Sequence, residues 1–235
     1  MRPLDAGRNL IGMDITNSVA VVTGANRGLG RHLAAQLLER GAKVYAGARV
    51  LSSVDLPGAI PLQLDITDPA SIERAAKAAP DVTLLINNAG TSLGQPLIGG
   101  DLDLIRQEME THYFGTLGVT RAFVPVIEAN GGGAILNVLS VLSWFHPAAA
   151  GAYSGAKAAG WAMTRAVRDE LAPRGIEVAA LHVGYMATDM AAGIPADQKT
   201  DPAVVARLAL DGLAAGAPEI LADDVTRGVK AGLSA

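Results

Sequence analysis

Short apolar runs alternate with longer segments of helical periodicity along the chain, and this alternation constrains the fold more than any other feature. Seven runs have the length and the small, branched side chains of buried strands: 19–23, 44–48, 60–64, 82–86, 134–139, 177–182 and 219–221. Strands that alternate with helices build a parallel sheet with right-handed crossovers. The predicted fold class is therefore α/β, a doubly wound parallel sheet with helices on both faces.

The composition suits such a sheet and argues against several classes of protein. Half of the residues are hydrophobic but only 4% are aromatic, so small side chains must fill the space between sheet and helices. The net charge of −4 comes without a basic patch, so we expect no nucleic-acid or membrane partner. There is no cysteine, and the four histidines lack metal-ligand spacing, so we expect no metal. No apolar run approaches the roughly 20 residues of a membrane span, and we expect a cytoplasmic protein.

The length of 235 residues fits a single domain. Residues 1–16 show no clear period and contain a second methionine, Met13, so we expect them to be a flexible leader. Residues 17–235 form the predicted domain. It includes a short substrate loop near 186–200, and a polar tail follows the last strand.

A glycine-rich turn joins the first strand to the first helix and reads Thr23-Gly-Ala-Asn-Arg-Gly-Leu-Gly30. Glycines there permit a tight turn and let backbone N–H groups approach a pyrophosphate at the helix N-terminus. The turn therefore predicts dinucleotide binding. The alternative is a purely structural turn.

The end of the second strand indicates which nicotinamide cofactor binds. A carboxylate there would bond the ribose 2′-hydroxyl and repel a 2′-phosphate. The chain instead has Ala48 and Arg49, and Arg27 in the glycine turn could reach the same phosphate. The predicted cofactor is NADP(H). The alternative is that Arg49 is only a solvated surface residue.

Tyr153 and Lys157 lie four residues apart at the start of a helical pattern, so they share one helix face. An ammonium beside a phenol favours the phenolate, so we expect a lowered tyrosine pKa and a role in proton transfer to or from an oxygen. Ser140 follows a predicted buried strand and could hold the same oxygen. Taken alone, a tyrosine–lysine pair at this spacing is in most cases solvated helix surface.

Taken together, these motifs and the Asn87-Asn-Ala-Gly90 segment make the chain resemble the short-chain dehydrogenases/reductases from about residue 15 onward. The resemblance implies a Rossmann-like seven-stranded sheet and hydride transfer between a nicotinamide cofactor and a ketone, aldehyde or alcohol. It implies that Tyr153 is the general acid/base, that Lys157 lowers its pKa and binds the nicotinamide ribose, and that Ser140 orients the substrate oxygen. Family members commonly form dimers or tetramers through two long helices, predicted here at 102–129 and 153–171, so we expect a homodimer or homotetramer.

The resemblance and the glycine turn together give the predicted cofactor-binding residues. They are Gly24, Asn26, Arg27, Gly28, Leu29, Gly30, Ala48, Arg49, Asp65, Ile66, Asn88, Ala89, Gly90, Tyr153, Lys157, Val183, Gly184, Met186 and Thr188. Asp65 is expected to bond the adenine. The residues from Val183 to Thr188 are expected to flank the nicotinamide carboxamide.

Two positions depart from the family pattern. Val183-Gly184 replaces the usual Pro-Gly after the sixth strand, with little expected consequence. His112 replaces the fourth catalytic residue, an asparagine whose main-chain carbonyl holds a relay water, and a histidine keeps that carbonyl. If the ring faces the relay, it should add an inflection between about pH 6 and 7.5. The alternative is a neutral ring packed beside Tyr113 and Phe114. His182, on a predicted strand, is expected to be structural.

Three functions compete on this sequence. The leading one is an NADP(H)-dependent oxidoreductase with Ser140, Tyr153, Lys157 and His112 as catalytic residues, acting on an apolar carbonyl compound or alcohol. A non-catalytic NADP(H) sensor would keep the glycine turn but need not keep Ser140, Tyr153 and Lys157. A structural protein that uses only the fold has little support. The sequence does not identify the substrate.

Overall fold

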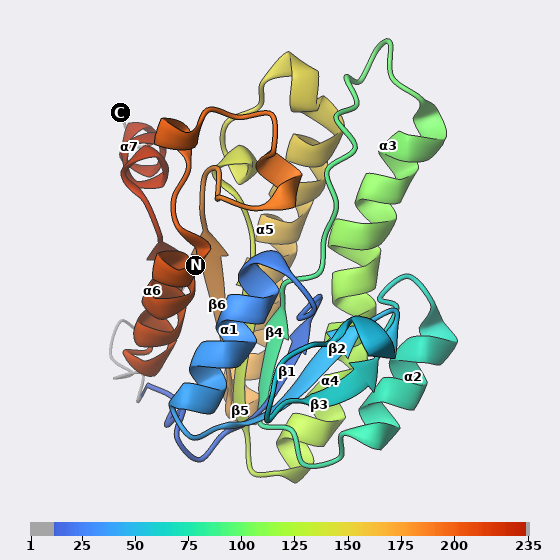
Figure 1. Ribbon diagram of the computed structural model, residues 1–235, viewed down its shortest axis with the longest axis vertical. Coiled ribbons are helices and arrows are strands. Elements are labelled where there is room, and N and C mark those ends of the chain that lie inside the picture. The colour runs from blue at the N-terminus through green and yellow to red at the C-terminus, as the bar shows by residue number, and fades with distance from the viewer. Residues whose placement is uncertain (1–11, 234–235) are drawn as a thin grey trace, which may run out of the picture.

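The computed structural model describes residues 12–233, and its centre is one seven-stranded sheet with the order β3-β2-β1-β4-β5-β6-β7 (Figure 1). All neighbouring strands are parallel. The strands are β1 (Val19–Thr23), β2 (Lys43–Ala48), β3 (Ile60–Gln63), β4 (Leu84–Asn87), β5 (Gly133–Val138), β6 (Ile176–His182) and β7 (Glu219–Leu221). The predicted fold class is confirmed.

Helices cover both faces of the sheet (Figure 1). They are α1 (Gly28–Glu39), α2 (Pro69–Ala78), α3 (Leu102–Met109), α4 (Thr116–Ala129), α5 (Gly151–Leu171), α6 (Pro202–Ala214) and α7 (Asp224–Gly232). Successive strand residues point to opposite faces. In β4, Leu84 and Ile86 pack in the core with α1 and α6, whereas Leu85 packs in the core with α2, α4 and α5.

The helix predicted over 102–129 is continuous but not uniform. A π-helical segment, Glu110–Gly115, separates α3 from α4. Gly115 faces the loop after β3, where a Cβ atom would come within 2.7 Å of the Ile66 carbonyl oxygen. Such π segments are rare and often occur at functional sites. His112 lies within this one.

The structure bears on two expectations about the ends of the chain, a flexible leader over residues 1–16 and a polar tail after β7. Residues 1–11 of the expected leader lie outside the described residues. From the rest of it, Ile15 is buried in the core beside α1 and α6, and its carbonyl accepts a hydrogen bond from the Ser18 hydroxyl at 2.8 Å. The polar tail predicted after β7 is helical: it forms α7, and the Asp223 carboxylate caps its first turn by accepting from the Thr226 N–H at 2.7 Å.

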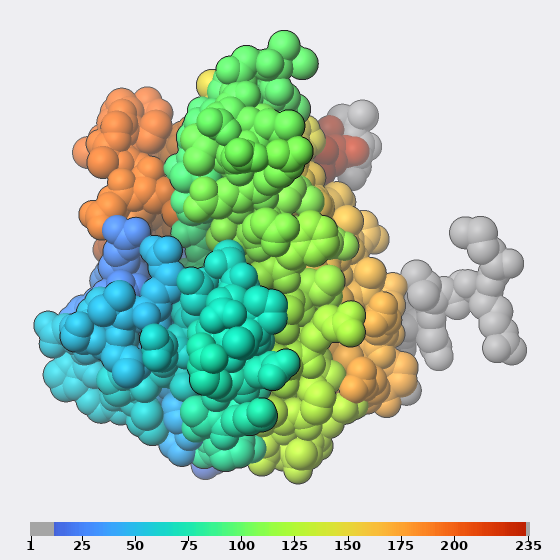
Figure 2. Space-filling model, turned by 90° about the vertical axis from the view of Figure 1, so that its right-hand side faces the viewer, coloured from blue at the N-terminus to red at the C-terminus, as the bar shows by residue number. Residues whose placement is uncertain are grey.

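The segments that carry the predicted site residues all leave the carboxyl end of the sheet, where parallel strands present their ligand-binding loops. Figure 2 shows this region from the side, with α3 (green) rising in the middle of the view and the segment around residues 186–200 (orange) to its left. A buried chain of side-chain hydrogen bonds fixes the strands beneath. Asn87 donates to Asn137 at 2.8 Å, and Asn137 donates to Thr164 of α5 at 2.9 Å.

Candidate active site

The glycine turn adopts a conformation that only glycine tolerates well. Gly24 and Gly28 have φ angles of 66° and 53°, in the left-handed region. A Cβ atom at Gly30 would overlap the carbonyl oxygen of Gly24 and the amide of Asn88. Asn88 in turn holds the turn in place, because its amide donates to the Thr23 carbonyl oxygen at 2.9 Å.

The N-terminus of α1 is open to an anion. Arg27 occupies the capping position in an extended conformation, its side chain makes no capping hydrogen bond, and the first turn contains no acidic residue. The first N–H groups of a helix need partners from outside the helix, and its dipole favours negative charge there. Leu29 is buried in the core, so only its backbone can serve a ligand. These features fit the pyrophosphate of a dinucleotide.

Two arginines lie on the same edge of the sheet. Arg27 follows β1 and Arg49 follows β2, and these strands are paired so that Thr23 is opposite Gly47. Ala48 is buried and offers no acid. Arg49 is exposed and close enough to Asp65 to affect it. Partial burial raises the pKa of Asp65, but hydrogen bonds from Thr67 and the charge of Arg49 outweigh this and leave that pKa below its usual value.

Ser140, Tyr153 and Lys157 come together as the sequence predicts. The Lys157 Nζ lies 5.5 Å from the centre of the Tyr153 ring and donates to the Val138 carbonyl oxygen at 2.9 Å. The Ser140 hydroxyl accepts from the Leu142 N–H at 3.1 Å and lies close enough to the Tyr153 phenol to lower its pKa. The helix α5 and the end of β5 therefore place a phenol, an ammonium and a hydroxyl around one point.

The predicted lowering of the tyrosine pKa is wrong for the protein alone. Part of Tyr153 is exposed, but the phenol group is enclosed by protein, and this burial raises its pKa. The Glu108 carboxylate raises it further, and only the nearby Ser140 hydroxyl acts in the other direction. Burial lowers the pKa of Lys157 to about 8, and the Glu108 carboxylate opposes that change. Burial and the Glu108 carboxylate therefore affect the pKa of Tyr153 more than its neighbour Lys157 does.

His112 combines features of the two arrangements expected for it, because its ring is buried and also faces the site. Its ring is buried and meets the Tyr153 ring edge to face, with centroids 5.1 Å apart, while Tyr113 and Phe114 pack against each other. Burial, and then the Lys157 charge, lower the pKa of His112. The ring therefore faces the site but stays neutral, and the inflection expected between about pH 6 and 7.5 should be absent. Its Nε2 donates to the Thr91 carbonyl oxygen at 2.7 Å.

Glu108 is a residue of the site that sequence reasoning missed. Its side chain is fully buried, one carboxylate oxygen accepts from the Leu93 N–H at 2.5 Å, and the other lies 3.3 Å from the His112 Nε2. Glu108 and His112 are four residues apart, one helical turn, so they share a face. This four-residue spacing is the sequence feature that could have identified Glu108 as a neighbour of His112.

The comparisons with known proteins agree with this geometry. The family model for short chain dehydrogenases matches residues 18–199. The chain belongs to the short-chain dehydrogenase family. It is an oxidoreductase of that family and acts on CH–OH groups.

Named relatives and one solved structure extend the comparison. A Vibrio cholerae 3-oxoacyl-[acyl-carrier-protein] reductase FabG is 32% identical over 198 residues, which cover 80% of this chain and 81% of the relative. A cis-4-hydroxycyclohexanecarboxylate dehydrogenase from Sinomonas cyclohexanicum is 33% identical over 230 residues, 91% of this chain and 92% of the relative. A short chain dehydrogenase from Burkholderia cenocepacia, solved in complex with NADP, is 41% identical with a TM-score of 0.91 and covers 95% of each chain.

The segment after β6 is held from both sides. The buried Val183 accepts from the Val141 N–H at 3.0 Å, and the Gly184 N–H donates to the Asp223 carboxylate at 2.7 Å. An isolated bridge between Met186 and Thr200 closes the loop that follows. The Thr188 methyl group approaches the glycine turn, since a Cβ atom at Gly28 would lie 3.5 Å from it. The loop thus brings the predicted Thr188 next to the predicted pyrophosphate site.

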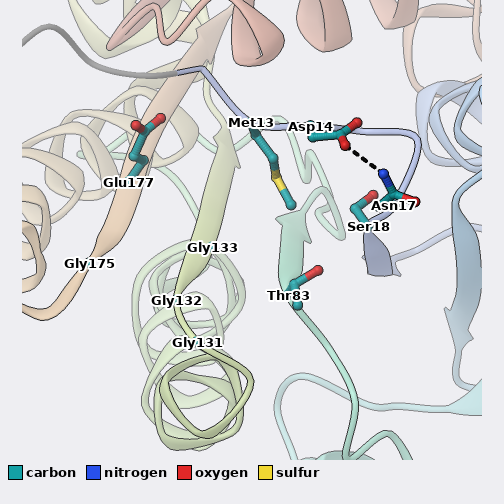
Figure 3. Close-up of a pocket in the computed structure, with 10 residues that line it drawn as sticks. All are labelled: Met13, Asp14, Asn17, Ser18, Thr83, Gly131, Gly132, Gly133, Gly175 and Glu177. Atoms are coloured by element: carbon teal, nitrogen blue, oxygen red, sulfur yellow. Dashed lines mark hydrogen bonds between the residues drawn. The ribbon is translucent and has the colours of Figure 1, made fainter.

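A hollow lies at the amino end of the sheet, opposite the candidate active site (Figure 3). It is lined by the amino ends of β1, β5 and β6 and by the segment before β1: Met13, Asp14, Asn17, Ser18, Thr83, Gly131, Gly132, Gly133, Gly175 and Glu177. None of these is a predicted site residue, and this dehydrogenase's candidate active site lies at the other end of the strands. Among residues 12–233 there is no cluster of three or more side chains suited to a metal ion. No helix in that range is long and apolar enough to cross a membrane.

Proposed function

We propose that the chain is an NADP(H)-dependent oxidoreductase that interconverts a ketone or aldehyde and its alcohol, with Tyr153 as the general acid/base. The observation that carries this proposal is the convergence of Ser140, Tyr153 and Lys157 at the carboxyl end of the sheet. The family to which the chain belongs supports the reaction class. The open N-terminus of α1 supports the cofactor.

In this proposal the bound cofactor supplies the hydride for reduction or accepts it in oxidation. The Ser140 hydroxyl holds the carbonyl oxygen, and the Tyr153 phenol donates its proton to that oxygen as negative charge develops there. The Lys157 ammonium stabilises the phenolate that is left. Because the pKa of Tyr153 is raised, the phenol carries its proton at neutral pH, as reduction requires.

The proposed substrate is apolar. Exposed large side chains follow two of the strands whose ends carry the site. Phe145 comes shortly after Ser140, and Tyr185 and Met190 follow β6; all three are about half exposed. The test is NADPH oxidation with a panel of apolar and polar ketones and aldehydes. Oxidation with apolar members supports the proposal. A protein that binds NADPH but reduces no member is a sensor instead.

The cofactor preference is a separate expected result. NADPH should bind at least about tenfold more tightly than NADH, because a charge-assisted contact to a phosphate is worth roughly 1.5–3 kcal/mol. Arg27 and Arg49 would supply such contacts. In the double variant Ala48→Asp/Arg49→Gln, the ratio of the NADPH affinity to the NADH affinity, measured by fluorescence titration, should become smaller or reverse. Arg106→Gln, a charge change on α3, serves as the control and should leave it unchanged. Equal affinity of the native protein for both cofactors contradicts the preference.

A further inference from the structure

Glu108 is a buried carboxylate that neither the fold nor the proposed reaction requires. No part of its side chain is exposed, although burying a charge is costly unless it is compensated. One oxygen accepts from the Leu93 N–H. The other has no hydrogen-bond partner among residues 12–233, because the nearby His112 Nε2 directs its proton to the Thr91 carbonyl. Each such orphaned atom in a folded protein calls for an explanation.

The neighbours of this carboxylate belong to the proposed active site. The carboxylate oxygen lies 3.3 Å from the His112 imidazole, and the imidazole ring meets the Tyr153 ring edge to face at 5.1 Å. Carboxylate, imidazole and phenol therefore contact one another in succession, from α3 through the π segment to α5. A side chain at Gly90 would collide with the imidazole, which leaves His112 that space.

We propose that Glu108 is a positioning residue that acts on Tyr153 through the His112 ring and keeps the tyrosine in the protonated form that carbonyl reduction consumes. The inference rests on the proposed function and adds a preferred direction to it. The carboxylate lies against the ring that packs on the phenol, and its negative charge opposes the formation of a second negative charge on Tyr153.

The charged and titratable groups around Tyr153 come from four elements. Lys157 is on α5 itself, Glu108 is on α3, His112 is on the π segment, and Ser140 follows β5. The two formal charges are the Glu108 carboxylate and the Lys157 ammonium, and their effects on the ionisation of Tyr153 have opposite signs. Interactions between buried charges are only weakly screened by salt. The effects of Glu108 on the pKa values of Tyr153 and Lys157 have the signs that this arrangement requires.

One experiment follows the pH dependence of alcohol oxidation, which needs the tyrosinate. Glu108→Gln removes the charge and keeps an oxygen for the Leu93 N–H. Its midpoint for oxidation should fall by at least about one pH unit relative to the native protein, a tenfold change in the ionisation equilibrium. The matched control is Glu110→Gln, two residues away and exposed, which should superimpose on the native profile. A merely structural Glu108 would lower the rates without moving the midpoint.

A second readout needs no turnover and so separates this inference from the proposed function. Tyrosine labelled with ¹³C at Cζ reports ionisation by NMR, and the Tyr153 signal is the one lost in Tyr153→Phe. In Glu108→Gln that signal should titrate at least one unit lower than in the native protein. Should this variant not fold, the double variant Glu108→Gln/His112→Asn removes the charge, keeps an oxygen for the Leu93 N–H and places two amides side by side, and the same shift is expected. Identical titrations in native and variant protein overturn the inference even if the enzyme is active.

Discussion

Replacing Tyr153 with phenylalanine should lower turnover by about 10²–10⁴-fold, the range typical of general acid–base catalysis. The change removes one oxygen and the proton that the carbonyl needs, while the aromatic ring stays in place against His112. NADPH affinity should stay within about threefold, because the glycine turn and the two arginines are unchanged. Steady-state rates with one active ketone and a fluorescence titration of the cofactor measure the two effects separately.

The control for this change is Tyr45→Phe. It makes the same chemical alteration on β2, where the hydroxyl donates to Asp81 at 2.9 Å far from the site. One lost hydrogen bond of this kind costs about 0.5–1.5 kcal/mol of stability and should leave turnover within about twofold. If Tyr153→Phe kept half of the native rate while Tyr45→Phe behaved as expected, another group would have to be the acid.

The parts of the fold that repeat a simple pattern could be predicted from the sequence. Each buried strand is a short apolar run, and each helix shows its own period, so the order of elements and the α/β class follow. The cap of α2 could also be predicted, because Asp68 precedes Pro69 and its carboxylate accepts from the Ala70 N–H. The helix α7 was not predicted, because nine mostly polar residues behind the last strand resemble a tail. Asp223, three residues before Thr226, was a capping signal.

The site divides along a similar line. Ser140, Tyr153 and Lys157 could be identified because their spacing in the chain encodes their placement on one helix and one strand end. Glu108 could not, because a lone glutamate in a helix is usually solvated, and only the packing of α3 against α5 buries it. The direction of the Tyr153 pKa shift was predicted wrongly for the same reason. A four-residue pair predicts one favourable charge, whereas the pKa depends on every buried group around the phenol.

His182 leads to a prediction about stability in acid. It is fully buried under the Ser140 segment, with its ring stacked on Trp144 at 3.9 Å and its Nδ1 positioned to donate to the Ser140 carbonyl oxygen at 3.3 Å. The Nε2 has no partner among the described residues. Protonation would add a buried N–H there without an acceptor, and burial lowers the pKa of His182 to about 4. In the unfolded chain the pKa is about 6.5.

The folded state should therefore lose stability as the pH falls from about 6.5 to about 4, where only the unfolded chain binds this proton. Relative to pH 7.5, the loss should be about 2 kcal/mol by pH 5 and about 3 kcal/mol by pH 4. His182→Phe keeps a flat ring against Trp144 and removes the titrating group. As the pH falls, the free energy of unfolding of this variant, measured with urea at several pH values, should decrease less steeply than that of the native protein. The difference in slope should correspond to at most one proton bound on unfolding. Equal slopes for the native protein and His182→Phe would mean that folding leaves the pKa of His182 unchanged.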